Sequence, residues 1–254
     1  MSDEVVLTLR APLEHRLEAD AIVPDRFPVL DARAIARLPV WYGGRSAAVG
    51  DFFTVTGERS DRVRVQGDLT RAVGLGAGMT NGELVIEGAA GRDTGAAMAG
   101  GAIDIRGTTG DNAGGALPGA SRGMTGGEIV IRGNAGADAG ARMRRGLITV
   151  AGDAGQGTGR GMIAGTVVVF GAAGPGTGRW LKRGSIVSFG AVVRPASFRY
   201  ACTYRPPHIR VLLRYLATRH GLPVTDGQIA GRYHRYSGDL AELGKGEILE
   251  WAGA

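Results

Sequence analysis

A glycine-marked repeat of 19 residues fills the middle of the chain and limits the folds that the chain can adopt. Five consecutive copies span residues 83–101, 102–127, 128–146, 147–165 and 166–184. The second copy is longer because it carries a seven-residue insert at residues 115–121. A degenerate copy at residues 62–82 precedes the five, and a closing half-copy at residues 185–190 follows them.

Each copy combines a short apolar stretch with a glycine-rich remainder. The first six residues read as a short strand that ends in Gly, and glycine recurs at unit positions 6, 9, 13 and 19. One strand in about 20 residues indicates a solenoid, because a single unit cannot bury its apolar face and stacked units share one core. We therefore predict an all-β fold whose centre is a right-handed parallel β-helix of about seven coils, with strands in register.

Two further features of the repeat have structural explanations. The glycines suit tight corners that need a positive φ or that leave little room for a side chain. Unit position 16 carries flexible apolar side chains, which predicts a stacked core row rather than a methionine metal site. The row consists of Met98, Met124, Met143, Met162 and Leu181.

The flanking segments predict caps for the two ends of the column, because an open coil end exposes unpaired strand groups and apolar core. Residues 1–61 read as an N-terminal cap, with a short helix over residues 32–38 that Asp31 would cap. Residues 62–190 form the solenoid. Residues 191–254 form a C-terminal extension, which reads as a cap, as a docking surface for another subunit, or as both.

The C-terminal extension is predicted to be partly helical. A helix is expected over residues 208–220, ended by Gly221, and a short amphipathic helix with an apolar end over residues 231–251. The apolar face expected for the first helix consists of Val211, Leu212, Tyr215 and Leu216.

The composition of the chain argues against several classes of partner and binding site. The 254 residues carry a formal net charge of +6, but without a long basic block and with 6% aromatic residues, so nucleic-acid binding is not expected. The single cysteine, Cys202, allows no disulfide within the chain and no cysteine metal site. No apolar run approaches the roughly 20 residues that cross a bilayer, and no signal pattern opens the chain. We therefore expect a cytoplasmic protein without membrane contact.

The repeat contains no recognisable catalytic constellation, so we expect neither a catalytic residue nor a metal site. Its loop acids fall at different unit positions, and the two that share one, Asp93 and Asp138, are two coils apart. The four histidines lie outside the repeats, without metal-ligand spacing. Cys202 near His208 could form a thiol–imidazole pair, but a cysteine that packs as a small apolar residue is the simpler interpretation.

Arginine recurs at unit positions 14 and 15, and equal positions in a stack lie along one edge. The predicted basic ridge consists of Arg122, Arg142, Arg160 and Arg179. One interpretation is a solvated edge that prevents sideways association. The other is a surface that binds an acidic subunit or the anionic tail of a carrier, and the sequence leaves both open.

The coils resemble the GXGXG domain shared by the glutamate synthase large subunit and the C subunit of formylmethanofuran dehydrogenase. The flanks resemble the C subunit of the bacterial formyltransferase/hydrolase complex, so that the resemblance covers nearly the whole chain. The segments that carry it are LPVWYGGRSAAVGDFFTVTG (38–57), FRYACTYRPPHIR (198–210) and GRYHRYSGDLAELGKGEILEW (231–251).

This resemblance implies a non-catalytic scaffold subunit that assembles with subunits A, B and D. Such a complex transfers a formyl group from formyl-tetrahydromethanopterin to a methanofuran analogue and hydrolyses the product to formate. The hydrolytic metal site and the formyl transfer would belong to subunits A and D, so this chain would bind no cofactor alone. The methanofuran-type carrier can bear a polyglutamate tail, which the basic ridge could bind. The alternatives are the C subunit of a molybdenum or tungsten formylmethanofuran dehydrogenase and a stand-alone β-helix enzyme.

Overall fold

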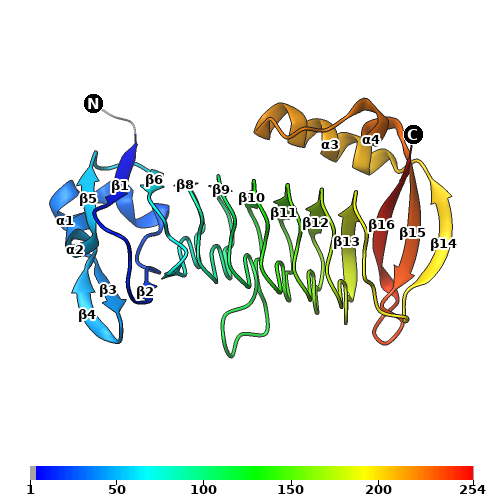
Figure 1. Ribbon diagram of the computed structural model, residues 1–254, viewed down its shortest axis with the longest axis horizontal. Helices are drawn as coiled ribbons and strands as arrows, with labels where there is room; N and C mark the ends of the chain where they lie inside the picture. Colours follow the sequence, from blue (N-terminus) through cyan, green and yellow to red (C-terminus); the bar gives the residue numbers. More distant parts are fainter. Residues whose placement is uncertain (1–3, 254) are drawn as a thin grey trace.

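The computed structural model describes residues 4–253 and shows a predominantly β protein, elongated along a column of stacked coils (Figure 1). The strands form a 12-stranded sheet and a 4-stranded sheet. The larger sheet has the order β14-β15-β16-β13-β12-β11-β10-β9-β8-β6-β1-β5, and the smaller has the order β4-β3-β2-β7. The larger sheet therefore runs the length of the column and includes strands from both flanks.

Each repeat unit contributes one strand to the middle of the larger sheet. These strands are β6 (Arg62–Gln66), β8 (Glu83–Glu87), β9 (Ala102–Ile105), β10 (Glu128–Ile131), β11 (Leu147–Val150), β12 (Thr166–Val169) and β13 (Arg183–Ser188). Neighbours pair in parallel with equal unit positions opposite each other, so that Ile129 lies between Ile103 and Ile148. The predicted pairing, parallel and in register, is confirmed for these strands.

The interior of the column is lined by rows of small or apolar residues, each row formed by one unit position in successive coils. Alternate strand residues are buried, such as Leu84 and Ile86 in β8. At unit position 8, single residues form parallel bridges from coil to coil, from Leu69 through Ala90 to Val192. The predicted row at unit position 16 is fully buried, and Met79 of the degenerate copy extends it.

Unit position 11 adopts a left-handed backbone, which was not predicted from the sequence. The φ angle is 59° at Asp93, 64° at Asn112 and 61° at Asp138, and Gly157 and Gly176 occupy the position in later coils. Asp and Asn enter this region more readily than other side-chain-bearing residues. The shared unit position of Asp93 and Asp138 therefore reflects a corner of the backbone.

The N-terminal segment closes one end of the column. Its β1 (Val5–Leu9) pairs in parallel with β6 and antiparallel with β5 (Phe53–Thr56), so the larger sheet is mixed rather than wholly parallel. The predicted cap of α1 (Ala32–Ala36) is present, because Asp31 accepts a hydrogen bond from the amide of Ala34. The other elements are β2 (Leu17–Glu18), η1 (Pro24–Val29), β3 (Pro39–Tyr42), β4 (Arg45–Ala48), α2 (Val49–Phe52) and β7 (Ala72–Val73).

The C-terminal segment adds both strands and helices to the other end. It contains β14 (Arg199–Tyr204), α3 (Pro207–His220), α4 (Asp226–Ala230), β15 (Arg232–Gly238) and β16 (Lys245–Gly253). β16 continues the parallel order beside β13, whereas β15 and β14 follow it antiparallel. The predicted helix within residues 231–251 is wrong, because this segment forms β15 and β16 joined by a turn. β15 pairs with β14 and β16, and β16 pairs with β13, so tertiary pairing overrides the local helical pattern.

Helix α3 lies on the outer face of the larger sheet and runs back along the column (Figure 1). Near its start, His208 Nε2 lies 3.8 Å from Glu247 Oε1 of β16. At its end, His220 Nε2 lies 3.3 Å from Glu128 Oε2 of β10, which also accepts a hydrogen bond from the Tyr215 hydroxyl. Within residues 4–253, every helix is too short or too polar to span a lipid bilayer.

The predicted bounds of α3 are confirmed to within one residue, and its predicted apolar face is correct in part: Leu216 is buried and Leu212 packs against the same cluster, whereas Val211 and Tyr215 are exposed. Ile209, Leu213 and Leu216 are buried in a cluster with outward-facing valines of β10, β12 and β13. Val211 is 70% exposed and lies away from the sheet. Which face of α3 is buried depends on the direction from which the helix packs against the larger sheet. The hydrophobic pattern within the helix does not determine that direction.

Candidate functional site

The basic ridge is a continuous edge of the column. Backbone hydrogen bonds join its positions from coil to coil: Gly123 N to Arg142 O (2.9 Å), Arg142 N to Arg160 O (2.8 Å), and Gly161 N to Arg179 O (2.8 Å). The side chains of Arg122, Arg142, Arg160 and Arg179 are all exposed. The four arginines therefore lie along one edge, as the repeat predicts.

The ridge is less positive than its four arginines suggest. Arg160 forms two hydrogen bonds with Asp138, from Nε to Oδ1 (2.8 Å) and from Nη2 to Oδ2 (2.6 Å). Among the residues that the structure describes, Arg160 is the one member of the ridge that forms an ion pair with a carboxylate. Arg142 instead donates from Nη1 to the carbonyl of Ala120, with an N–O distance of 3.0 Å.

A shallow hollow of about 290 Å³ opens on the ridge between Arg160 and Arg179. Its other lining residues are Asp138, Gln156, Gly157, Pro175 and Gly176. The hollow presents the guanidinium groups of Arg160 and Arg179, donors that suit a carboxylate-bearing partner, and the Asp138 carboxylate neutralises part of their charge. It has no group placed as a nucleophile with an adjacent base.

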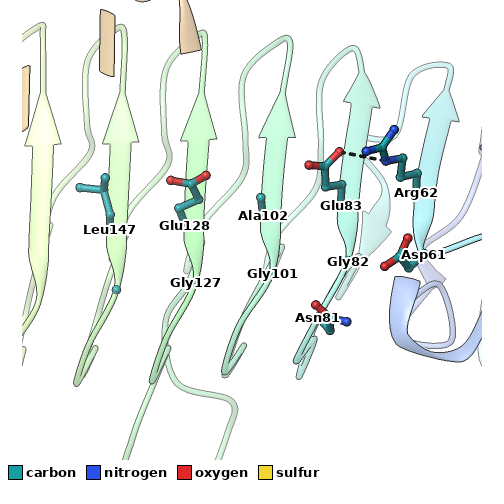
Figure 2. Close-up of a pocket in the computed structure, with 11 residues that line it drawn as sticks. Asp61, Arg62, Asn81, Gly82, Glu83, Gly101, Ala102, Gly127, Glu128 and Leu147 are labelled. Atoms are coloured by element: carbon teal, nitrogen blue, oxygen red, sulfur yellow. Dashed lines mark ion pairs between the residues drawn. The ribbon is translucent and has the colours of Figure 1, made fainter. Parts of the chain in front are cut away.

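A larger hollow of about 560 Å³ follows the corners that precede β6, β8, β9, β10 and β11; Asp61 precedes β6, and glycines precede the other four strands (Figure 2). The corner at unit position 19 has no room for a side chain: a Cβ on Gly101 would lie 2.5 Å from Met79 Cε and 2.8 Å from the Gly82 carbonyl oxygen. Arg62 and Glu83 flank it with an Nε–Oε2 distance of 3.7 Å. Packing thus accounts for these glycines without a ligand.

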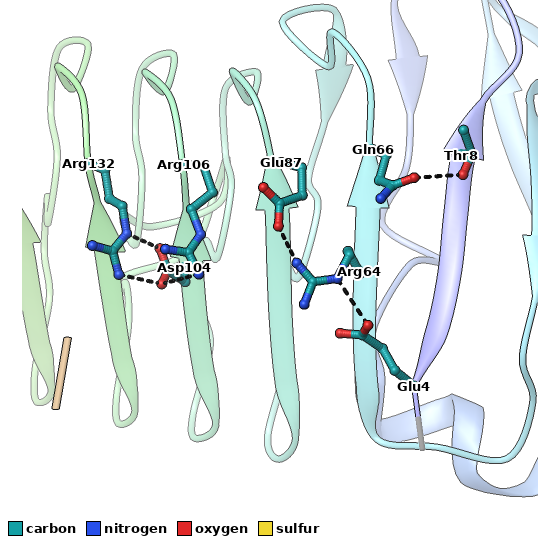
Figure 3. A network of polar contacts seen from close by, with 8 residues as sticks. All are labelled: Glu4, Thr8, Arg64, Gln66, Glu87, Asp104, Arg106 and Arg132. Atoms are coloured by element: carbon teal, nitrogen blue, oxygen red, sulfur yellow. Dashed lines mark hydrogen bonds and ion pairs between the residues drawn. The ribbon is translucent and has the colours of Figure 1, made fainter. Parts of the chain in front are cut away.

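Two ion-pair networks occupy the outer sheet face that α3 leaves uncovered (Figure 3). Arg64 of β6 bridges Glu4 (Nε–Oε2 3.0 Å) and Glu87. In the second network, Arg132 donates twice to Asp104, at 2.9 and 2.8 Å, and this hydrogen bonding raises the pKa of the Arg132 guanidinium despite partial burial. Because the charges of these two networks balance, this face offers no surplus positive charge for an anion.

The loop acids have structural roles. Asp111 accepts a hydrogen bond from the amide of Ala137 (2.7 Å), and Asp153 accepts one from the amide of Ala172 (2.7 Å), each in the following coil. Within residues 4–253, no group of three or more His, Cys, Asp or Glu side chains is arranged to hold a metal ion. Cys202 is exposed rather than packed as a small apolar residue.

Two features on the ridge were not predicted from the sequence. Trp180 is 48% exposed beside Arg179, whose guanidinium carbon lies 5.9 Å from the centre of the indole ring. The insert at residues 115–121 was recognised as a break in period but was given no role. The signal for both is present in the sequence: one unit carries extra residues, and one unit has Trp at position 15, where the other units have Ala, Gly or Arg.

No protein-family model matches the chain. The chain is 37% identical over 93 residues to the C subunit of the molybdenum-containing formylmethanofuran dehydrogenase 1 of Methanosarcina barkeri, covering 35% of this chain and 31% of that protein. It is 33% identical over 90 residues to the C subunit of the tungsten-containing formylmethanofuran dehydrogenase 2 of Methanothermobacter marburgensis, covering 34% of this chain and 33% of that protein. The chain thus aligns with about a third of the length of these curated relatives.

A solved structure matches over nearly the whole chain. It is the X-ray crystal structure of the formyltransferase/hydrolase complex (FhcABCD) from Methylorubrum extorquens in complex with methylofuran. The match has a TM-score of 0.78 and 32% sequence identity, and it covers 96% of this chain and 98% of that chain. The likeness therefore includes both flanks as well as the repeat.

Proposed function

This chain belongs to the family of C subunits of formylmethanofuran dehydrogenases and formyltransferase/hydrolase complexes, and from that premise we propose that it is the scaffold subunit of a formyltransferase/hydrolase complex. The complex would transfer a formyl group from formyl-tetrahydromethanopterin to a methanofuran analogue and hydrolyse it to formate. This chain would supply no catalytic residue, and its partners would be subunits A, B and D in the cytoplasm.

The observation that carries this proposal is the extent of the structural match. The chain covers 98% of a chain of the formyltransferase/hydrolase complex, but about a third of the curated dehydrogenase subunits. A subunit that meets the same partners needs the same outer surface, and that surface includes the caps. Similarity over both flanks therefore favours the formyltransferase/hydrolase assembly.

A second candidate is the C subunit of a molybdenum or tungsten formylmethanofuran dehydrogenase. The local identities of 37% and 33% to such subunits favour it. The two candidates differ in their partners, because the dehydrogenase reading requires molybdenum or tungsten and iron–sulfur proteins. Metal analysis of the complex purified through this chain separates them.

The same proposal includes the architecture of the scaffold and the role of its basic ridge. We assign the stacked coils of residues 62–190 to a right-handed parallel β-helix, with residues 1–61 and 191–254 as its two caps. Parallel pairing in register from β6 to β13 supports this assignment. The basic ridge would face an acidic subunit or the anionic tail of a methanofuran-type carrier, as its exposed guanidinium groups permit.

Reconstitution tests the scaffold role. Subunits A, B and D are co-expressed with or without this chain, and formate release from formyl-tetrahydromethanopterin is measured with the methanofuran analogue present. The full set is expected to form a stable, active complex, and the isolated chain to release no formate. Formate release by this chain alone would overturn the proposal in favour of a stand-alone enzyme.

A further inference from the structure

The insert in the second repeat forms a loop that leaves the column on the side opposite α3; residues 115–121 are hereafter the insert loop (Figure 1). The coil beneath it keeps the geometry of its neighbours. Met124 donates from its amide to Gly114 O at 2.9 Å, and Met143 donates to Gly140 O at 3.1 Å in a copy without an insert. The insert loop therefore adds surface to the column without altering its stacking.

The base of the insert loop is fixed by hydrogen bonds on both sides. Asn112 Nδ2 donates to Ala116 O (2.9 Å), and Arg142 Nη1 donates to Ala120 O (3.0 Å). The amide of Ala116 also donates to Ala141 O of the next coil (3.1 Å). A loop held in this way loses little conformational entropy when it binds a partner.

The tip of the insert loop is apolar and stands beside the basic ridge. Leu117 is 37% exposed, and Pro118 is also exposed. Arg122 is the single charged residue in the segment 113–127, and it is the first member of the ridge. An uncharged, apolar tip thus lies next to exposed guanidinium groups, and Arg is among the residues that are enriched at protein interfaces.

Trp180 forms a matching apolar feature at the other end of the ridge, and the backbone there is unusual. Trp180 has φ 62° and Arg142 has φ 56° at unit position 15, where Gly161 occupies the same left-handed region with φ 64°. Ala97 has φ 57° at the same unit position, so the left-handed corner belongs to the repeat. At this corner the ridge carries two large side chains, those of Arg142 and Trp180.

We propose that Leu117 and Trp180 are two apolar anchors, one at each end of the basic ridge, that dock on an acidic-rimmed apolar surface of a partner subunit. This inference rests on the proposed function, since it names the surface through which the scaffold holds that subunit. A free polyanion fits less well, because it offers no apolar surface to Leu117 or Trp180. The acidic rim follows from the guanidinium groups that lie between the two anchors.

Deletion of the insert loop tests the proposal without removing any residue of the regular repeat. The shortened copy reads Gly114-Arg122-Gly123-Met124, which matches Gly159-Arg160-Gly161-Met162 in sequence and in period. The full-length chain without residues 115–121 is titrated against the co-expressed partner subunits, and thermal unfolding checks its fold. Leu117→Asp and Trp180→Ala are measured in parallel, so that a folding defect in one variant does not decide the outcome.

The dissociation constant of the complex between this chain and the partner subunits is expected to rise about tenfold or more for each variant. Val29→Asp is the matched control, because Val29 is 83% exposed on the N-terminal segment, and its dissociation constant should stay within about twofold of wild type. If the wild-type chain assembles and the three variants bind equally well, the inference is overturned while the scaffold role stands. If the wild-type chain does not assemble at all, the proposed function fails.

The polyanion alternative is tested with poly-L-glutamate. Arg122→Glu should weaken subunit binding more at low salt than at high salt, because exposed charges are screened. If the same substitution abolishes binding of poly-L-glutamate and leaves subunit affinity unchanged, the ridge binds an anionic ligand, and the docking proposal is overturned.

Discussion

Asp239 holds Trp180 in place: its Oδ2 accepts a hydrogen bond from the Trp180 amide at 2.8 Å. Its Oδ1 accepts a second from the amide of Ala241 at 2.9 Å, and Asp239 is 1% exposed. The turn between β15 and β16 is thereby tied to the last coil. This contact positions one end of the basic ridge and closes the C-terminal end of the column.

Asp239→Asn is expected to destabilise the protein in a pH-dependent way. Burial raises the pKa of Asp239, but hydrogen bonds from Ser197, Ala241 and Trp180 outweigh burial and lower it below the usual 3.8. A lowered folded pKa contributes stability above the unfolded pKa, and this contribution is lost as pH falls through the folded value. At pH 7 the free energy of unfolding of the variant should be about 1.5–3 kcal/mol lower than that of wild type, which is the contribution of a hydrogen bond to a charged group.

Urea unfolding of wild type and Asp239→Asn between pH 2.5 and 7 checks this prediction. The difference in unfolding free energy should shrink below pH 4, where wild type also becomes protonated. Glu242→Gln, in the same turn, is the control and should change stability by less than about 0.5 kcal/mol. A constant difference across the pH range would mean that the charge of Asp239 does not stabilise the turn.

Gly101→Ala is expected to destabilise the column more than Gly44→Ala. The two glycines have almost equal φ angles, +79° and +80°, so both substitutions place an L-residue in the left-handed region. A Cβ on Gly101 meets the Gly82 carbonyl oxygen at 2.8 Å, whereas nothing lies within 4 Å at Gly44. Gly101→Ala should lower the free energy of unfolding by about 1–3 kcal/mol more than Gly44→Ala does, which is the usual cost of overpacking. Equal unfolding free energies for the two variants would show that the stacked corners tolerate a side chain.

Met143→Ala is expected to leave a cavity in the buried row at unit position 16. Met143 is 0% exposed, and truncation of a buried Met to Ala typically costs about 2–5 kcal/mol. Met143→Leu should cost less than about 1.5 kcal/mol, because Leu181 fills the same unit position in the last copy, also fully buried. Denaturant unfolding of both variants measures the difference. Equal losses would contradict a close-packed row.

The stacking of the repeat could be predicted from the sequence because each constraint recurs in every coil. Position 16 had the same apolar character five times, and the strand positions alternated in phase, so that Ile129 could be placed beside Ile148 before any coordinates. The basic ridge followed from the same reasoning. When the same pattern occurs in five copies, an ambiguous residue in one copy does not change the prediction, whereas in a segment that occurs once it can.

The caps could not be predicted in the same detail, because their structure depends on pairing partners that occur once. The pattern within residues 231–251 predicts a short amphipathic helix, yet this segment forms β15 and β16, which pair with each other, and β16 also pairs with β13. The exposed Val211 was expected to be buried because periodicity identifies a stripe but not which side of it meets the sheet. The strained backbone at Arg142 was equally invisible, since a φ angle has no signature in an arginine.

Native mass spectrometry of the complex purified through a tag on this chain tests the scaffold role most directly. We expect one assembly that contains this chain with subunits A, B and D of a formyltransferase/hydrolase complex. We also expect the deletion of residues 115–121 to shift this chain toward the free form. Recovery of the chain alone, or with molybdenum or tungsten and iron–sulfur proteins, would contradict the scaffold role in a formyltransferase/hydrolase complex.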